Sequence, residues 1–175
     1  PPPLAPATAP DEALLSPLSP DEVLGVLDVV RGVIVAGRGA GDPAAVERIA
    51  TLLGWPVLAD PRSCCRTLDA AVSAFDPILR HPQFAADHRP DAVLHLGEPP
   101  ASKVLSQWLH ASGAVHVQVH AQQRIIDPMQ FVTHRVYATP TDWITAMLES
   151  TSVPTVAGAR GTPWTTRWQI GRAHV

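Results

Sequence analysis

The sequence predicts a single α/β domain with a Rossmann-like architecture, in which helices cover both faces of a mostly parallel sheet of five or six strands. Short runs rich in β-branched residues, such as Gly32–Ala36, lack polar alternation, as expected of strands that are buried on both faces. Amphipathic helical stretches alternate with these runs, and the connections between them are short. Such alternation is typical of β-α-β units in a three-layer domain.

The predicted helices carry recognisable start and stop signals. Asp42 and Pro43 provide an N-cap and a proline at the first helical position, and Gly54 ends the same helix. Thr139 or Thr141 begins the last helix of the domain. We expect helices over residues 21–28, 43–53, 68–80, 102–111 and 140–149, and strands over residues 32–36, 55–59, 92–96, 115–119 and 132–138.

The composition of the chain narrows the functional classes. The 175 residues carry a formal net charge of −3, which argues against a nucleic-acid-binding protein, because such proteins usually carry a basic patch. The apolar runs are far shorter than the roughly 18 residues of a membrane span. The first residues show none of the features of a signal peptide. We therefore expect a cytoplasmic domain with no membrane span and no nucleic-acid partner.

The two flanks of the chain differ from its centre. Residues 1–18 are rich in proline and are expected to form an interdomain linker. The domain is expected over residues 19–150, and a second linker over residues 151–169. The last residues, 170–175, resemble a translated sequencing adapter, so we leave them out of the functional interpretation.

Basic residues follow three of the predicted strands. In a parallel sheet the carboxyl ends of the strands lie at one edge, where ligands bind. Arg38 follows the first strand, Arg62 and Arg66 follow the second, and Lys103 follows the third. Lys103 is the only lysine among the thirteen basic residues. Because a guanidinium can bind a carboxylate or phosphate through two hydrogen bonds and an ammonium offers a compact charge, the sequence predicts an anionic ligand at this edge.

The loop after the first strand also invites a nucleotide-binding interpretation. The run Gly37–Gly41 holds three glycines, and Asp60 stands about where a ribose-binding acid is expected. Asp42, however, takes the place of the third glycine of the motif, and its carboxylate would occupy the helix N-terminus that a pyrophosphate needs. The simpler interpretation is a tight turn, with Asp60 as a turn residue before Pro61. A free-standing nucleotide-binding Rossmann module is the alternative function.

The cysteines and histidines do not form a recognisable site in the sequence. Cys64 and Cys65 lack a second cysteine pair and a histidine at ligand spacing, so no zinc site is expected. The histidines are scattered, and His116 and His120 lie four residues apart in a predicted strand, so they do not share a helix face. We therefore expect neither a metal site nor a catalytic residue within this chain.

Three ordered segments resemble the MenD family, the 2-succinyl-5-enolpyruvyl-6-hydroxy-3-cyclohexene-1-carboxylate synthases of menaquinone biosynthesis. They are residues 31–37 (RGVIVAG), 55–63 (WPVLADPRS) and 99–103 (PPASK), and the resemblance extends from about residue 25 to residue 168. It implies the Rossmann-like middle domain of a three-domain enzyme, with the linker over 151–169 leading to a pyrophosphate-binding domain. It also implies that this fragment alone is inactive.

The resemblance implies a particular chemistry for the parent enzyme. Thiamine diphosphate and Mg²⁺, bound mainly by the other domains, would serve the decarboxylation of 2-oxoglutarate and the addition of the resulting succinyl carbanion to isochorismate. Thiamine diphosphate enzymes build their sites between subunits, so the parent is expected to be a homodimer or a homotetramer. In such an enzyme the cofactor carries the chemistry, and the protein supplies orientation and electrostatics.

The resemblance also assigns substrate-binding residues to the edge that carries the basic side chains. The family's middle domain contributes a Ser-Lys step that faces the substrate carboxylates, and Ser102-Lys103 matches it. Val104 stands where some members have an arginine, and Arg66 is a candidate replacement for that contact. Arg38 and Arg62 are candidates for a separate anion or effector site on the same rim.

Overall fold

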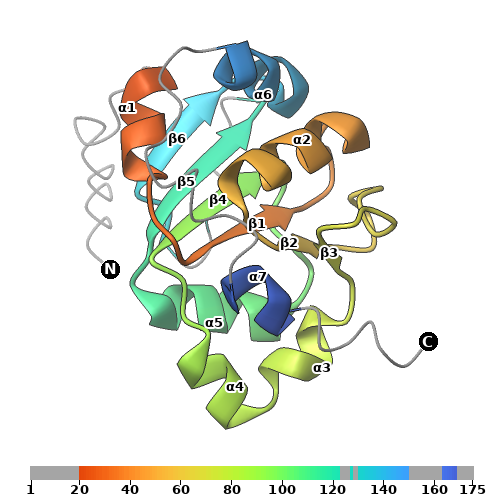
Figure 1. Cartoon of the computed structure of the whole chain (residues 1–175), viewed down its shortest axis with the longest axis vertical. Coiled ribbons are helices and arrows are strands. Elements are labelled where there is room, and N and C mark those ends of the chain that lie inside the picture. Colours follow the sequence, from red (N-terminus) through yellow and green to blue (C-terminus); the bar gives the residue numbers. More distant parts are fainter. Residues whose placement is uncertain (1–19, 123–126, 128–129, 150–162, 169–175) are drawn as a thin grey trace, which may run out of the picture.

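The computed structural model describes residues 20–122, 127, 130–149 and 163–168 (Figure 1). Its centre is a sheet of six strands in the order β3-β2-β1-β4-β5-β6, and every neighbouring pair is parallel. The strands are β1 (Gly32–Ala36), β2 (Val57–Ala59), β3 (Ala71–Val72), β4 (Ala92–Leu96), β5 (Val115–His120) and β6 (His134–Tyr137). The predicted Rossmann-like, parallel α/β architecture is confirmed.

Helices cover both faces of this sheet, as Figure 1 shows. One face carries α1 (Pro20–Val26), α2 (Pro43–Leu53) and α6 (Pro140–Glu149). The other face carries α3 (Phe75–Leu79), α4 (Pro82–Asp87), α5 (Lys103–Ser112) and α7 (Pro163–Trp168). The domain therefore has three layers, with the sheet in the middle.

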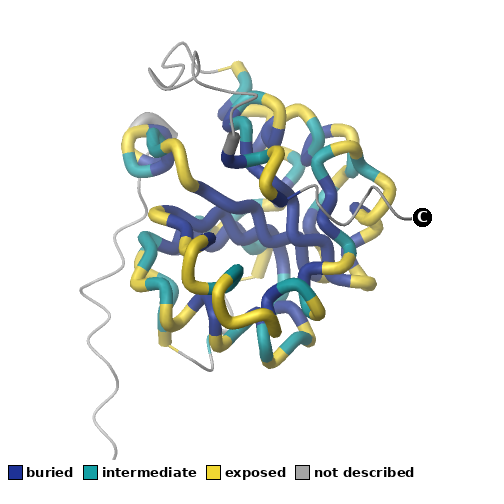
Figure 2. Tube along the Cα trace, turned by 60° about the horizontal axis from the view of Figure 1, so that its bottom comes forward, coloured by how far each residue is buried: buried dark blue, intermediate teal, exposed yellow. Residues whose placement is uncertain are grey.

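The core divides into two apolar clusters, one on each side of the sheet. Along β1, Ile34 and Ala36 face the α2 side, whereas Val33 and Val35 face the α5 side. This alternation follows from the period of two residues in a strand. All five residues of β1 are buried, and Figure 2 shows the buried strands running through the middle of the molecule. The prediction that β1 is covered on both faces is confirmed.

The helix predicted over residues 68–80 is wrong. The segment forms the short edge strand β3, a turn and then α3, which begins only at Phe75. Pro77 explains the difference, because proline has no backbone N–H and its ring would clash with the carbonyl of residue 73 in a helix that began at 68. The apolar side chains that predicted the helix nevertheless belong to the core on the α5 side: Val72, Phe75 and Leu79 are buried there, and Ile78 packs against them half-buried.

The predicted flanks meet the described residues only in part. Residues 1–18 and 170–175 lie outside them, so the linker and the adapter stay predictions. Within the predicted linker 151–169, residues 163–168 form α7. Trp164 on this helix is buried, and its indole N–H donates to the carbonyl of Gly32 at 2.8 Å. This part of the predicted linker thus packs against the domain.

Candidate functional site

The loops after β1, β2 and β4 lie at the same edge of the sheet, because the strands are parallel and adjacent. Arg38, Arg62 and Arg66 lie in these loops, and Lys103 begins α5 directly after the loop that follows β4, so all four predicted cations follow strands that end at this edge. The order of the strands also puts the topological switch point of the sheet between β1 and β4, where α/β proteins commonly bind ligands. These loops therefore form the candidate site.

Two glycines bring the loops after β1 and β4 into direct backbone contact. A β-carbon on Gly37 would overlap the carbonyl oxygen of Glu98, and one on Gly97 would overlap the carbonyl oxygen of Arg38. The N–H of Glu98 donates to the carbonyl of Arg38 at 2.9 Å. Gly97 has a φ of 80°, which favours glycine at this position. The crevice at the switch point is thus closed by the protein's own backbone.

The N-terminus of α2 is also occupied by the protein itself. The carboxylate of Asp42 accepts the N–H of Ala45 at 3.1 Å, as an N-cap does. The N–H of Asp42 in turn donates to the Thr141 hydroxyl at 2.9 Å. A dinucleotide pyrophosphate would need these same donors. The predicted N-cap is confirmed, and the geometry disfavours the nucleotide-binding alternative.

Asp60 joins the loop after β2 to the loop after β4. Its carboxylate is 1% exposed and accepts the N–H of Ala101 at 2.9 Å on one oxygen. The other oxygen accepts the backbone N–H and the Nε–H of Arg62 at 2.9 and 3.0 Å. Burial alone would raise the pKa of this carboxyl, but the hydrogen bonds from Ala101 and Arg62 outweigh it, and the pKa lies below its usual value. Asp60 is thus an ionised link between two loops.

Arg62 spans the gap between the same two loops. Its guanidinium donates to the carbonyl of Pro99 at 3.1 Å and lies 4.0 Å from the carboxylate of Glu98. Together with the pairing to Asp60, these contacts engage the guanidinium within the protein, although the Arg62 side chain is 44% exposed. The side chain that was predicted as part of an anion rim therefore serves as a bridge in this structure.

Ser102 caps α5 and is fixed from both sides. Its hydroxyl oxygen accepts the N–H of Leu105 at 3.1 Å, and its O–H donates to the carboxylate of Asp76 on α3 at 2.9 Å. The Ser102 hydroxyl lowers the pKa of the Asp76 carboxyl, and Arg80, 3.2 Å from Asp76, lowers it further. The hydroxyl predicted to face substrate is therefore engaged in holding the start of α5.

Lys103 is the first residue of α5 and is exposed. Within the described part of the chain its ammonium makes no hydrogen bond or ion pair. A positive charge in the first turn of a helix is opposed by the helix dipole, so this lysine does not stabilise its own helix. The geometry leaves the Lys103 ammonium available to a ligand.

Arg66 and Arg38 are the other two predicted cations whose surroundings bear on the site. Arg66 donates to the carbonyl of Ser73 at 3.5 Å, just beyond β3 at the edge of the sheet. Two strands, β2 and β1, separate β3 from the strand that leads to Lys103. Arg38 is exposed at the end of β1. The structure thus does not join Arg66 to Lys103 by any contact among the described residues.

A pair of buried histidines lies beneath the loop after β4. Nε2 of His95 lies 3.1 Å from the carbonyl oxygen of Glu98, and Nδ1 of His95 lies 3.2 Å from Nε2 of His116. Since a carbonyl only accepts, His95 carries its proton on Nε2 and accepts from His116. Burial lowers the pKa of His95 to about 4, and burial together with His95 lowers that of His116 well below its usual value. Both rings are therefore neutral at pH 7.

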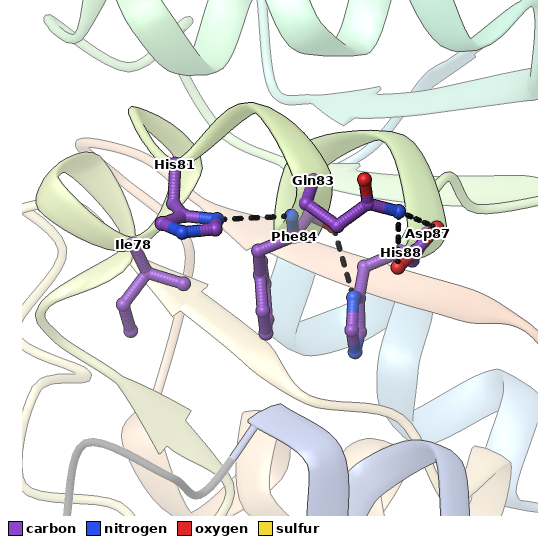
Figure 3. A pocket seen from close by; sticks show the side chains of 6 residues that line it. All are labelled: Ile78, His81, Gln83, Phe84, Asp87 and His88. Atoms are coloured by element: carbon purple, nitrogen blue, oxygen red, sulfur yellow. Dashed lines mark hydrogen bonds between the residues drawn. The ribbon is translucent and has the colours of Figure 1, made fainter.

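A pocket of about 450 Å³ lies elsewhere, along α4 (Figure 3). Its polar side chains bond within the helix: the His81 ring accepts the N–H of Phe84, and Gln83 donates to Asp87. His88 stacks on Phe84 with ring centroids 3.7 Å apart. Because α4 leads into the amino end of β4, this pocket is not part of the candidate site.

The described residues contain no group of three or more histidine, cysteine or acidic side chains placed to hold a metal ion. Among the same residues no helix is both long and apolar enough to cross a membrane.

Sequence reasoning missed the roles of two residues of the site, Asp60 and Asp76. The sequence offers Asp60 as a ribose-binding acid or a turn residue and gives no signal at Asp76. The partners of these two carboxylates, Ala101 and Ser102, are 41 and 26 residues away in the chain, so no local pattern indicates them.

Comparison with known proteins agrees with this fold. A family model described as "Middle domain of thiamine pyrophosphate" matches residues 15–169. Three relatives, all named 2-succinyl-5-enolpyruvyl-6-hydroxy-3-cyclohexene-1-carboxylate synthase, illustrate the similarity. That of Salinibacter ruber is 36% identical over 87% of this chain and 27% of its own length. That of Synechococcus elongatus is 34% identical over 83% of this chain and 25% of its own length. That of Thermosynechococcus vestitus is 44% identical over 46% of this chain and 15% of its own length.

The chain thus spans between 15% and 27% of the length of these curated relatives. The matched region of the family model covers all six strands and both helical layers. The chain therefore belongs to the family of thiamine pyrophosphate enzyme middle domains.

Proposed function

We propose that this chain is the middle domain of a thiamine diphosphate-dependent synthase that decarboxylates 2-oxoglutarate and adds the succinyl group to isochorismate. The name shared by the relatives supports the reaction. The product in that name carries carboxylates on its ring, its succinyl group and its enolpyruvyl group. A domain that forms one wall of such a site needs a cation directed at a carboxylate.

Lys103 is the observation that carries this proposal for the present chain. It is exposed at the carboxyl end of β4, and its ammonium has no partner among the described residues. We assign it the role of binding a substrate carboxylate. Ser102 is assigned to the same site through its place beside Lys103 and its cap on α5, and Arg66 stays a candidate second cation.

The described residues do not fit a binding site for the cofactor itself. The N-terminus of α2 is capped by Asp42, the crevice between β1 and β4 is closed, and no metal-ligating group is present among these residues. We therefore propose that thiamine diphosphate and Mg²⁺ bind to other domains of the parent enzyme, and that this chain alone does not turn over. The proposed parent is a cytoplasmic homodimer or homotetramer.

Steady-state kinetics of the full-length enzyme with Lys103→Ala test this proposal. A hydrogen bond to a charged group contributes about 1.5–3 kcal/mol, so the KM for 2-oxoglutarate or isochorismate should rise about tenfold or more. Lys103→Arg keeps the charge and should lose less. Arg89→Ala, an exposed arginine just before β4 at the opposite edge of the sheet, is the matched control and should leave both KM values unchanged. Unchanged KM values in Lys103→Ala would remove Lys103 from the site.

A further inference from the structure

The Asp60 carboxylate is shared between two loops that carry different parts of the rim. It accepts the N–H of Ala101 at 2.9 Å, and Ala101 lies two residues before Lys103. Its other oxygen accepts two donors from Arg62, whose guanidinium reaches on to the carbonyl of Pro99. One buried carboxylate therefore fixes both ends of the segment Pro99–Ala101.

The buried Asp60 carboxylate contributes little net stability to the fold. Removing a carboxylate from water is unfavourable, and the pairing with Arg62 and the N–H donors offsets that cost without a large net gain. Arg62 remains 44% exposed, which weakens the ion pair further. What the buried carboxylate does secure is one defined geometry, because any displacement of Ala101 leaves a buried charge without its donor.

The residues on either side of Ala101 transmit that geometry to Lys103. Ser102 is held by Asp76 and by its cap on Leu105, so the first turn of α5 starts at one place. Glu98, on the other side, donates to the carbonyl of Arg38 and accepts from His95. The loop is thus tied at Glu98, Pro99, Ala101 and Ser102, and Lys103 is the first residue beyond these ties.

We propose that Asp60 is a positioning residue, which holds the loop Pro99–Ser102 against the end of β2 and so sets where the Lys103 ammonium meets a substrate carboxylate. Arg62 supports the same loop, because its guanidinium donates to both Asp60 and the carbonyl of Pro99. This inference rests on the proposed role of Lys103 and assigns no contact between Asp60 and the substrate.

A positioning role and a purely structural role predict different kinetics. A variant that is only less stable contains less active enzyme, which lowers the maximal rate but leaves KM unchanged. A variant that frees the loop raises KM, because the Lys103 ammonium is no longer held in the position that binds the substrate carboxylate. If Asp60 acts through Lys103, its removal has no further effect on KM once the lysine is gone.

The experiment is a double-mutant cycle in the full-length enzyme, with Asp60→Asn and Lys103→Ala alone and combined. Asparagine keeps the size of the side chain but replaces one carboxylate oxygen with an NH₂ group. That group cannot accept the hydrogen bond that the oxygen received from Ala101 or from Arg62. We expect Asp60→Asn to raise the KM for the substrate that depends on Lys103 by roughly three- to tenfold, and to leave the KM of Lys103→Ala unchanged. Hydrogen exchange at the Ala101 amide should be faster in Asp60→Asn, which reports the freed loop without catalysis.

Two further variants keep the test decisive. Asp91→Asn breaks an exposed ion pair with Arg31, 2.7 Å long, at the amino ends of the strands, and should change neither KM nor Ala101 exchange. If Asp60→Asn does not fold, Arg62→Ala removes the hydrogen bond to the Pro99 carbonyl from a half-exposed position. It should raise KM in the same non-additive way, by a smaller factor.

A KM effect of Asp60→Asn that adds fully to that of Lys103→Ala, or no KM effect at all while Lys103→Ala has one, would overturn the positioning role. No effect of Lys103→Ala would instead overturn the proposed role of Lys103, on which this inference rests.

Discussion

The carbonyl oxygen of Glu98 occupies the place that a β-carbon on Gly37 would take, so the ends of β1 and β4 touch through their backbones. In many α/β proteins the corresponding crevice holds a ligand. Here it is filled by the protein, and Lys103, the first residue of α5, has an ammonium without a partner among the described residues.

This contact predicts a large loss of stability in Gly37→Ala. The obstructing atom belongs to the backbone and cannot turn away, so the two loops must separate. We expect about 3 kcal/mol less free energy of unfolding, as for an overpacked core, measured by urea denaturation. Gly25→Ala on α1 is the control, because a β-carbon there meets no atom within 4 Å and alanine favours helix. Equal stability of the Gly37→Ala and Gly25→Ala variants would contradict the close contact.

The capped N-terminus of α2 predicts that the chain does not bind dinucleotides. Titration calorimetry with NAD, NADP and FAD should give no heat of binding at micromolar protein. Asp42→Ala should lower the free energy of unfolding by about 1 kcal/mol through loss of the cap to Ala45, and Asp42→Asn should lose less. Micromolar binding of any of the three nucleotides would revive the alternative function.

The buried histidines predict that stability falls as the solution becomes acidic. The pKa of His95 is lowered to about 4 in the folded chain, so between about pH 6.5 and pH 4 the unfolded chain binds a proton that the folded chain does not. Stability therefore decreases as pH falls through this window, by up to about 1.4 kcal/mol per pH unit for each such histidine. His116 shifts in the same direction.

The check is the urea midpoint from pH 7.5 to pH 4.5. The double variant His95→Gln and His116→Gln keeps amide donors but cannot titrate, and its midpoint should depend less on pH than that of the wild type. His110→Gln, an exposed position on α5, serves as the control and should keep the wild-type dependence. A double variant with an undiminished slope would mean that other groups cause the acid sensitivity.

The layers of the fold were predictable, and the contacts between the loops were not. Buried β-branched runs such as Gly32–Ala36 and caps such as Asp42 act locally, so the sequence pattern predicted the bounds of β1, β4 and α2 correctly. The helix predicted over 68–80 was wrong because its apolar spacing outweighed Pro77 in the interpretation. The edge strand β3, only two residues long, has no periodicity to detect.

The same distinction between local signals and contacts between loops applies to the candidate site. The position of Lys103 beyond β4 follows from its place in the chain and from the parallel sheet. The role of Asp60 depends on which loops meet, since Ala101 is 41 residues away and its N–H could pair with any nearby acceptor. The bridging of Arg62 to Pro99 is likewise a consequence of strand order, because β2 and β4 flank β1.

The most direct measurement of the central claim is the protection of Lys103 from chemical acetylation in the full-length enzyme. Lys103 is the only lysine of this chain, so mass spectrometry of its peptide reports a single amine within the domain. We predict that saturating substrate dicarboxylate slows the acetylation of Lys103 several-fold. An acetylation rate that substrate does not change, in enzyme that turns over normally under the same conditions, would contradict the account.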